Sequence, residues 1–251
     1  MTAEPPIAQL ADFPDGWRHA TVIVAHPDDI EWGVAAAVAA WTTAGRTVSY
    51  VLVTSGEAGI DGMDPAVATV VRQGEERASG AIVGVSDIEF LGHPDGRVVE
   101  GLDLRRDIAA AIRRHRPDVV VAQHHGERWG SNPGAGWNSA DHRAVGRATM
   151  DAVSDASNRW IFTDIPEEPW AGVQWVAVPG PSGTHAVDVS AVVDRAVASL
   201  AAHADYIRGL GVEDPQAFAR DLVEGQTSGV APSYGGRPAV AFELVPGPAA
   251  P

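Results

Sequence analysis

Residues 20–29 read Ala-Thr-Val-Ile-Val-Ala-His-Pro-Asp-Asp, and the fold prediction starts from this stretch. Its first half, residues 20–25, is a short β-branched apolar run that predicts a fully buried strand. Residues 30–45 are typical of a helix that stops at Gly45. A second buried strand is predicted over residues 47–54, so the chain begins with strand, helix, strand.

The same alternation continues along the chain. Further strands are predicted over residues 87–91, 118–122, 173–178 and 239–245. Further helices are predicted over residues 66–83, 101–116, 140–154, 190–209 and 214–224. This order predicts an α/β fold, with a doubly wound, mostly parallel sheet flanked by helices.

We expect residues 1–251 to form a single domain, because no linker divides the chain. Residues 20–150 are expected to be the catalytic core, and residues 151–245 to complete the fold and the substrate pocket. Residues 246–251, Pro-Gly-Pro-Ala-Ala-Pro, are expected to form a disordered tail.

Two absences in the composition exclude several chemistries. The 251 residues include no cysteine and no lysine, so all 18 basic residues are arginines. Without cysteine there is no disulfide framework, thiolate nucleophile or Cys-type zinc site. Without lysine there is no Schiff base and no P-loop lysine.

Net charge and hydropathy bear on the cellular location of the protein and on the classes of partner that it can bind. A net charge of −15 argues against a nucleic-acid partner or an anionic membrane surface. The amino-terminal residues lack the pattern of a secretory signal, and no apolar run approaches the roughly 18 residues of a membrane span. We therefore expect a cytoplasmic protein. Its oligomeric state stays open, with a homo-oligomer among the outcomes.

The first strand ends directly in a group of metal-binding side-chain types. In parallel sheets, functional sites lie beyond the carboxyl ends of the strands, which is where His26, Asp28 and Asp29 fall. A tight turn aims His26 and Asp29 at one ion, and Asp28 then lies beside that ion. The alternative is that Pro27-Asp28-Asp29 is only a turn and a helix N-cap.

His142 is the best candidate for a third ligand, because the helix it opens follows the fourth strand along the same sheet edge. Two histidines and one aspartate with an open position are typical of a catalytic zinc site. Zinc lowers the pKa of water, and Asp28 would act as the general base.

An acidic end of the first strand is also typical of receiver domains and of haloacid-dehalogenase-type phosphatases. Both of these classes rely on a lysine, and this chain has none. A dinucleotide-binding turn would need a glycine fingerprint where this chain has HPDDIEWG, so the sequence excludes that class as well.

Six stretches, in order, resemble the zinc-dependent N-acetylglucosaminyl de-N-acetylases of the PIG-L/LmbE family. They are Ala25–Asp29, Thr54–Gly59, Arg72 with Glu75, Phe90-Leu91 with Asp95-Gly96, Arg116–Val120 and Asp141–Arg143. The resemblance covers residues 20–150. It implies a Rossmann-like α/β fold and hydrolysis of an N-acetyl group from substrates that contain N-acetylglucosamine.

The resemblance also implies a role for each matching residue. His26, Asp29 and His142 would bind Zn²⁺, and Asp28 would be the base. Arg72 and Asp95 would hold substrate hydroxyls. For Arg72 the alternative is an arginine on the solvent face of a helix, and for Asp95 it is a plain Asp-Gly turn.

One departure from the family pattern concerns the proton donor. Family members often have His-Pro-Asp-His where this chain has Ser139-Ala140-Asp141-His142, and serine supplies no cation at neutral pH. Asp141, which would orient that histidine, either keeps an orienting role or caps the helix. His125 and its neighbour His124 are the nearest candidates to replace the acid. The alternative is that both are ordinary loop residues.

The leading hypothesis is a zinc-dependent hydrolase that removes an N-acetyl group from an amino-sugar-containing small molecule. One alternative is an amidase that acts on a larger sugar or thiol conjugate. Another is a catalytically weak homologue that binds metal and sugar. Trp129, Trp137 and Trp170 lie in predicted loops, where they either stack on sugar rings or pack against the protein. His203 is expected to be structural.

Overall fold

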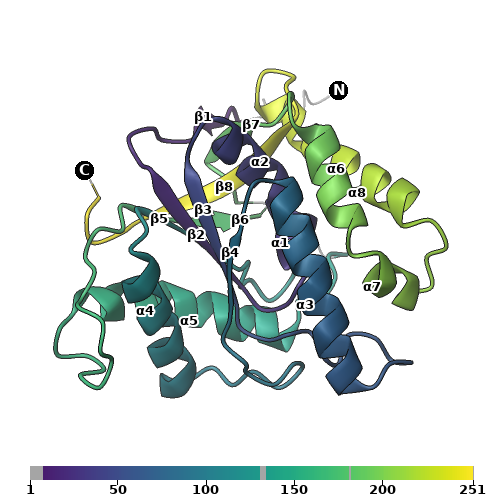
Figure 1. Cartoon of the computed structure of the whole chain (residues 1–251). Coiled ribbons are helices and arrows are strands. Elements are labelled where there is room, and N and C mark those ends of the chain that lie inside the picture. Colours follow the sequence, from purple (N-terminus) through teal and green to yellow (C-terminus); the bar gives the residue numbers. More distant parts are fainter. Residues whose placement is uncertain (1–7, 131–133, 181, 251) are drawn as a thin grey trace.

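A computed structural model describes residues 8–130, 134–180 and 182–250, in which one eight-stranded sheet has the order β1-β7-β8-β6-β5-β2-β3-β4. Strand β8 is antiparallel to its neighbours β6 and β7, and the other neighbouring strands are parallel. Helices cover both faces of the sheet (Figure 1). The predicted α/β fold, a mostly parallel sheet flanked by helices, is confirmed.

The helices and strands have the following bounds. The strands are β1 Ala11–Asp12, β2 His19–Val24, β3 Thr47–Leu52, β4 Asp87–Phe90, β5 Val119–Ala122, β6 Trp175–Pro179, β7 His185–Asp188 and β8 Ala239–Pro246. The α-helices are α1 Asp29–Gly33, α2 Ala35–Thr43, α3 Pro65–Ile82, α4 Leu102–His115, α5 Ala140–Ser157, α6 Val193–Ala201, α7 Ala204–Gly209 and α8 Pro215–Val230. A short 3-10 helix covers Ala231–Ser233.

The central strand β2 contributes side chains to two separate hydrophobic cores. Val22 and Val24 belong to the core that includes α2, α6 and α8, whereas Ile23 belongs to the core that includes α4 and α5. Successive strand residues point to opposite faces, so a continuously apolar strand is what a sheet covered on both sides requires. Figure 1 shows α4 and α5 on one side of the sheet and α6 and α8 on the other.

Two predicted helices are each interrupted. The helix expected over residues 30–45 breaks at Val34, whose φ of −133° and ψ of −2° are not helical. The helix expected over residues 190–209 breaks between Ala201 and Ala204, where His203 turns inward and is fully buried. In both places the apolar pattern continues through the break, so the sequence pattern gives no sign of it.

The segments β1 and β7 and the carboxyl terminus also differ from expectation. β1 and β7 are too short to leave a periodic signal, and neither was predicted. The expectation of a disordered tail is wrong up to residue 250. The backbone N–H groups of Gly247 and Ala249 donate to Gln174 at 2.8 Å and Val173 at 2.9 Å. Pro251 lies outside the described residues.

The topology places two chain segments together at the centre of the sheet. From β2 the chain moves outward through β3 and β4, then returns to β5 on the other side of β2. β2 and β5 pair in parallel, with Ile23 opposite Ala122. The segments after their carboxyl ends therefore meet at a topological switch point, where α/β folds place ligands.

Among the helices that the structure describes, none combines the length and the apolar character that a membrane crossing needs.

Candidate metal centre

The turn after β2 sets the positions of the first two candidate ligands. Asp28 has a left-handed backbone with φ of 89°, a conformation that aspartate tolerates better than most residues. It reverses the chain so that α1 begins at Asp29. The backbone N–H of His26 then donates to Asp29 Oδ2 at 2.8 Å, which fixes this carboxylate beside the His26 ring.

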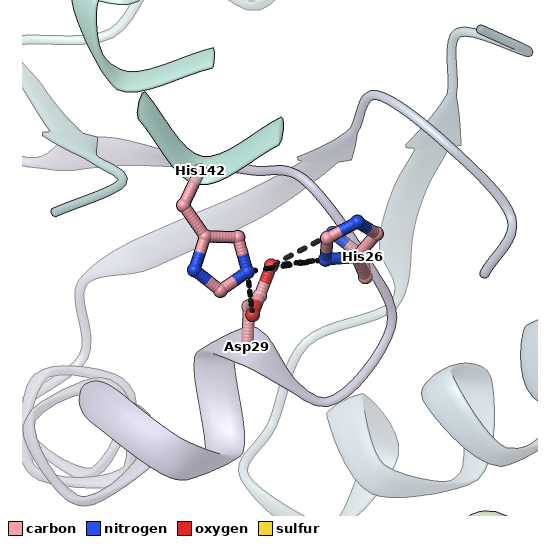
Figure 2. A group of neighbouring side chains, drawn as sticks. All are labelled: His26, Asp29 and His142. Atoms are coloured by element: carbon pink, nitrogen blue, oxygen red, sulfur yellow. Dashed lines mark hydrogen bonds and ion pairs between the residues drawn. The ribbon is translucent and has the colours of Figure 1, made fainter. Parts of the chain in front are cut away.

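His142 joins these two residues from the first turn of α5, and the three side chains point toward one another (Figure 2). His26 Nδ1 lies 3.3 Å from Asp29 Oδ2 and 3.2 Å from His142 Nε2, and His142 Nε2 lies 3.0 Å from Asp29 Oδ1. Ligands at about 2.0–2.2 Å from a tetrahedral zinc ion lie about 3.3 Å from one another. The donor types and their spacing therefore fit a divalent cation.

Asn138 determines which nitrogen of His142 faces the cluster. Its side-chain amide donates to the carbonyls of His124 at 3.0 Å and Gly126 at 2.9 Å, which identifies the amide nitrogen. The amide oxygen is therefore the atom 3.0 Å from His142 Nδ1, and it accepts that N–H. Nε2 is left with its lone pair directed at Asp29, as a ligand requires.

Carboxylates orient His26 in the same way. Asp95 Oδ1 and Asp141 Oδ2 lie 3.1 Å and 3.2 Å from His26 Nε2, so this nitrogen carries the proton and Nδ1 faces the cluster. Burial opposes protonation of His26, but Asp29 and these two carboxylates raise its pKa well above the ordinary value. A carboxylate behind a histidine is a common outer-shell arrangement at metal sites.

His26, Asp95 and Asp141 form a second group of potential ligands. The carboxylate oxygens of Asp95 and Asp141, however, already accept hydrogen bonds from the protein. Asp141 accepts backbone N–H groups from Gly96 at 2.8 Å and Val98 at 3.1 Å. Asp95 accepts the N–H of Ala58 at 2.8 Å. The first group, in which the carboxylate of Asp29 meets two ring nitrogens, is the better metal site.

Asp28 lies beside the cluster and is held by Arg72 from α3. Arg72 donates to Asp28 Oδ1 at 2.7 Å and also to the backbone carbonyl oxygens of Pro27 and Gly56. Burial raises the pKa of Asp28 to about 7, although the Arg72 guanidinium opposes this shift. A carboxyl with this pKa exchanges a proton near neutral pH, which is what a general base does.

The comparison with protein families agrees with this geometry. The family described as GlcNAc-PI de-N-acetylase (PIG-L) matches residues 21–153, more than half of the chain and the segment from β2 to α5. The chain belongs to the PIG-L family. The resemblance to PIG-L/LmbE proteins is thereby confirmed.

Two curated relatives of this PIG-L protein have names that describe deacetylases. It is 28% identical over 145 residues to a probable N-acetyl-alpha-D-glucosaminyl L-malate deacetylase 2 of Bacillus anthracis, covering 55% of this chain and 60% of that one. It is 31% identical over 181 residues to a 1D-myo-inositol 2-acetamido-2-deoxy-alpha-D-glucopyranoside deacetylase of Kineococcus radiotolerans, covering 58% and 48%. The chain thus spans about half to three fifths of the length of these relatives.

A solved structure shares the fold along most of the chain. It is the N,N'-diacetylchitobiose deacetylase of Pyrococcus horikoshii, with a TM-score of 0.79 and 20% identity. The similarity covers 92% of this chain and 84% of that one.

A buried charged group behind Asp28 was not identified from the sequence. Glu31, Glu76 and His203 are fully buried, and His203 Nε2 lies 3.2 Å from Glu31 Oε2 and 3.7 Å from Glu76 Oε2. Glu76 also accepts the backbone N–H of Asp28 at 3.2 Å, so the group supports the left-handed turn. The full burial of His203 and its position between two carboxylates agree with the expected structural role, which stays a prediction. The spacing of the three residues in sequence contains no signal that would have joined them.

The remaining predicted residues lie in different surroundings. Ser139 is the N-cap of α5, where its Oγ accepts the N–H of His142 at 3.4 Å, so Asp141 does not cap this helix. His124 lines a cavity beside Asp29 and stacks on Trp129 with ring centroids 5.7 Å apart. His125 instead lies against Gly146 of α5.

The three loop tryptophans divide into two groups. Trp129 is half-exposed, and its ring meets the edge of His142 with centroids 5.3 Å apart. Trp137 is exposed near Arg143, with the guanidinium 5.1 Å from its ring. Trp170 packs against the protein, because its Nε1 donates to Pro117 at 2.7 Å.

We expect Asn138→Ala to weaken binding of a divalent cation about 10- to 100-fold, because His142 loses the acceptor that orients its ring. Isothermal titration with Zn²⁺ measures this change. Asn158→Ala is the matched control, because Asn158 is the C-cap at the opposite end of α5. Equal metal affinity in wild type and Asn138→Ala would contradict the orienting role.

We expect His203→Leu to lower the free energy of unfolding by about 3–5 kcal/mol, because two buried carboxylates lose their cation. Burial alone would lower the pKa of His203, but Glu31 and Glu76 raise it to about 9. The contribution of protonated His203 is thus complete below its unfolded pKa of about 6.5 and is lost as pH rises through about 9. Urea unfolding between pH 6 and pH 9 measures both effects.

Arg220→Leu removes an exposed ion pair on α8 and serves as the control, with little change expected. If His203→Leu unfolds at the same urea concentration as wild type, the buried pair does not stabilise the fold.

Proposed function

We propose that this protein is a zinc-dependent hydrolase that removes an N-acetyl group from an amino-sugar-containing small molecule. The observation that carries the proposal is the meeting of His26, Asp29 and His142, with the Asp28 carboxyl beside them. Membership of the PIG-L family and the names of the two relatives support the type of reaction and the amino-sugar substrate.

The reaction joins water to the acyl carbon and breaks the bond between this carbon and the amide nitrogen. His26, Asp29 and His142 would hold a divalent cation, which would supply Lewis acidity to lower the pKa of water and to polarise a carbonyl. Asp28 accepts the proton that water loses as it attacks. The products are a carboxylate and an amine, and the amine nitrogen gains a proton as the bond breaks.

Arg72 and Asp95 contact the proposed base and a candidate metal ligand. The family resemblance assigns Arg72 and Asp95 to substrate hydroxyls. The Arg72 side chain is only 2% exposed and is paired with Asp28, whereas Asp95 contacts His26. These contacts support a role for Arg72 in orienting the base and for Asp95 in orienting a ligand.

The mechanism also needs a residue that donates a proton to the leaving amine. The Ser139 hydroxyl acts as a helix cap, and Asp141 is engaged by His26 and two backbone N–H groups. His124 is the better of the two histidine candidates, since it lines the cavity beside Asp29. Burial is the main cause that lowers the pKa of His125, so a smaller fraction of this side chain carries the proton that an acid must donate.

A second candidate function follows from Ser139. If no group replaces the missing acid, the protein binds metal and sugar but turns over weakly. Stoichiometric zinc and bound ligand, together with no release of acetate from a panel of acetylated amino sugars, would favour this function. For the cellular location we retain the cytoplasm as a proposal, with a small molecule rather than nucleic acid or membrane as the partner.

We expect Asp28→Asn to lower kcat for acetate release about 10²- to 10⁴-fold and to leave bound zinc near one equivalent, because the base is lost while the three ligands stay. Acetate assays together with metal analysis of the purified protein measure the two quantities. Asp103→Asn, an exposed change in the first turn of α4, is the control. The proposal fails if Asp28→Asn is as active as wild type or if wild type binds no divalent cation.

We expect His124→Gln to lower kcat at least 10²-fold, because removal of a general acid typically has this effect. His125→Gln is its matched neighbour and should change kcat little. The same acetate assay, run across pH, compares the two variants. A larger loss in His125→Gln would reverse the assignment of the acid.

A further inference from the structure

A cavity of about 340 Å³ opens beside Asp29, between the sheet and helix α8. Apolar side chains from four elements form much of its lining. They include Val22 and Val24 of β2, Val121 of β5, Ala36 of α2, and Val223 and Val230 of α8. Its volume is within the range of pockets that bind small molecules.

The break between α1 and α2 helps to create this space. Around the break at Val34, the chain presents the small residues Gly33, Ala35 and Ala36 to the cavity. A Cβ atom added at Gly33 would have nothing within 4 Å. This part of the lining therefore consists of residues with no side chain or a short one.

Few polar groups line the deeper part of the cavity, and two of them have partners inside the protein, whereas the buried Nε1 of Trp32 has none among the described residues. Thr227 donates its hydroxyl to the Val223 carbonyl at 2.8 Å, and the Glu31 carboxylate pairs with His203 at 3.2 Å. The polar side chains of Asp29, Gln123 and His124 lie where the strands end, at the candidate metal centre. The lining is thus polar at the end near Asp29 and mostly apolar toward α8.

We propose that this cavity holds the acyl chain of the amide substrate, and that the protein acts on N-acyl amino sugars with chains of about six to eight carbons. The inference rests on the proposed amide hydrolysis at the same site and extends the acyl group from acetyl to longer chains. The carbonyl carbon lies at the Asp29 end, the hydrocarbon chain extends toward α8, and the sugar amine stays outside.

The chemistry of the lining favours an acyl chain over a sugar ring. A sugar placed there would lose the hydration of several hydroxyls, and the few polar side chains of the lining, such as Trp32, would replace only part of their hydrogen bonds, which is costly. Each methylene of an acyl chain instead gains free energy by leaving water. An apolar cavity of about 150 Å³ holds benzene, so this larger cavity accommodates a chain of the proposed length.

The test is a chain-length series of N-acylglucosamines carrying acetyl, butyryl, hexanoyl and octanoyl groups, offered to the zinc-loaded full chain. Release of glucosamine gives kcat/KM for each amide. We expect kcat/KM to rise about two- to fourfold for each added methylene until the cavity is filled. A flat or falling series overturns the inference, although acetate release would still support the proposed function.

A cavity-filling variant connects the chain-length effect to this cavity. Val230 lines the cavity and is half-buried, and Val230→Phe should lower the octanoyl-to-acetyl ratio of kcat/KM at least tenfold. Ala241→Leu, also in the lining, is a second variant in case the first fails to fold. Val70→Phe, an exposed change on α3, should leave the ratio as in wild type.

A binding measurement separates failure of the inference from failure of the proposed function. Calorimetric titration of zinc-loaded Asp28→Asn with the same four amides needs no turnover. Affinity that rises with chain length supports the acyl cavity even if no amide is hydrolysed. Affinity that ignores chain length but rises with an apolar group on the sugar would assign the cavity to that group and overturn the inference.

Discussion

The parallel pairing of β2 with β5 is the contact on which the candidate site depends. These strands lie side by side although the chain forms β3 and β4 between them, so the turn after β2 meets the loop and helix after β5. His26 and Asp29 come from the first segment and His142 from the second. If the order of β2 and β5 were different, the three side chains would be at different places along the sheet edge.

Hydrogen bonds from the surrounding loops then fix the side chains within that frame. Asn138 joins the loop after β5 to His142, and Asp141 joins the loop after β4 to His26. Each bond uses the ring nitrogen that points away from the cluster. Because the protein supplies both orienting groups, the free nitrogens already face Asp29, and little reordering is needed for a cation to bind.

Much of this arrangement follows from the sequence, because strand ends and metal-ligand types are local signals. Residues 20–29 predict a buried strand that ends in ligands, and the position of His142 after a later strand places it at the same edge. The orienting role of Asn138 has no such signal, since it depends on which carbonyls the folded loop presents. His203 and Glu31 are far apart in sequence, and His203 lies in the break between α6 and α7. The continuous apolar pattern of residues 190–209 does not predict this break.

Ser139 has a structural role at the start of α5. Its hydroxyl faces the backbone N–H of His142, so this residue stabilises the helix that carries a candidate ligand. Serine is a favoured N-cap, and in this geometry its oxygen accepts a hydrogen bond from the backbone N–H of His142. His124, which follows β5 at the same edge of the sheet, lines the cavity beside Asp29, so the chain has an imidazole there and not at position 139.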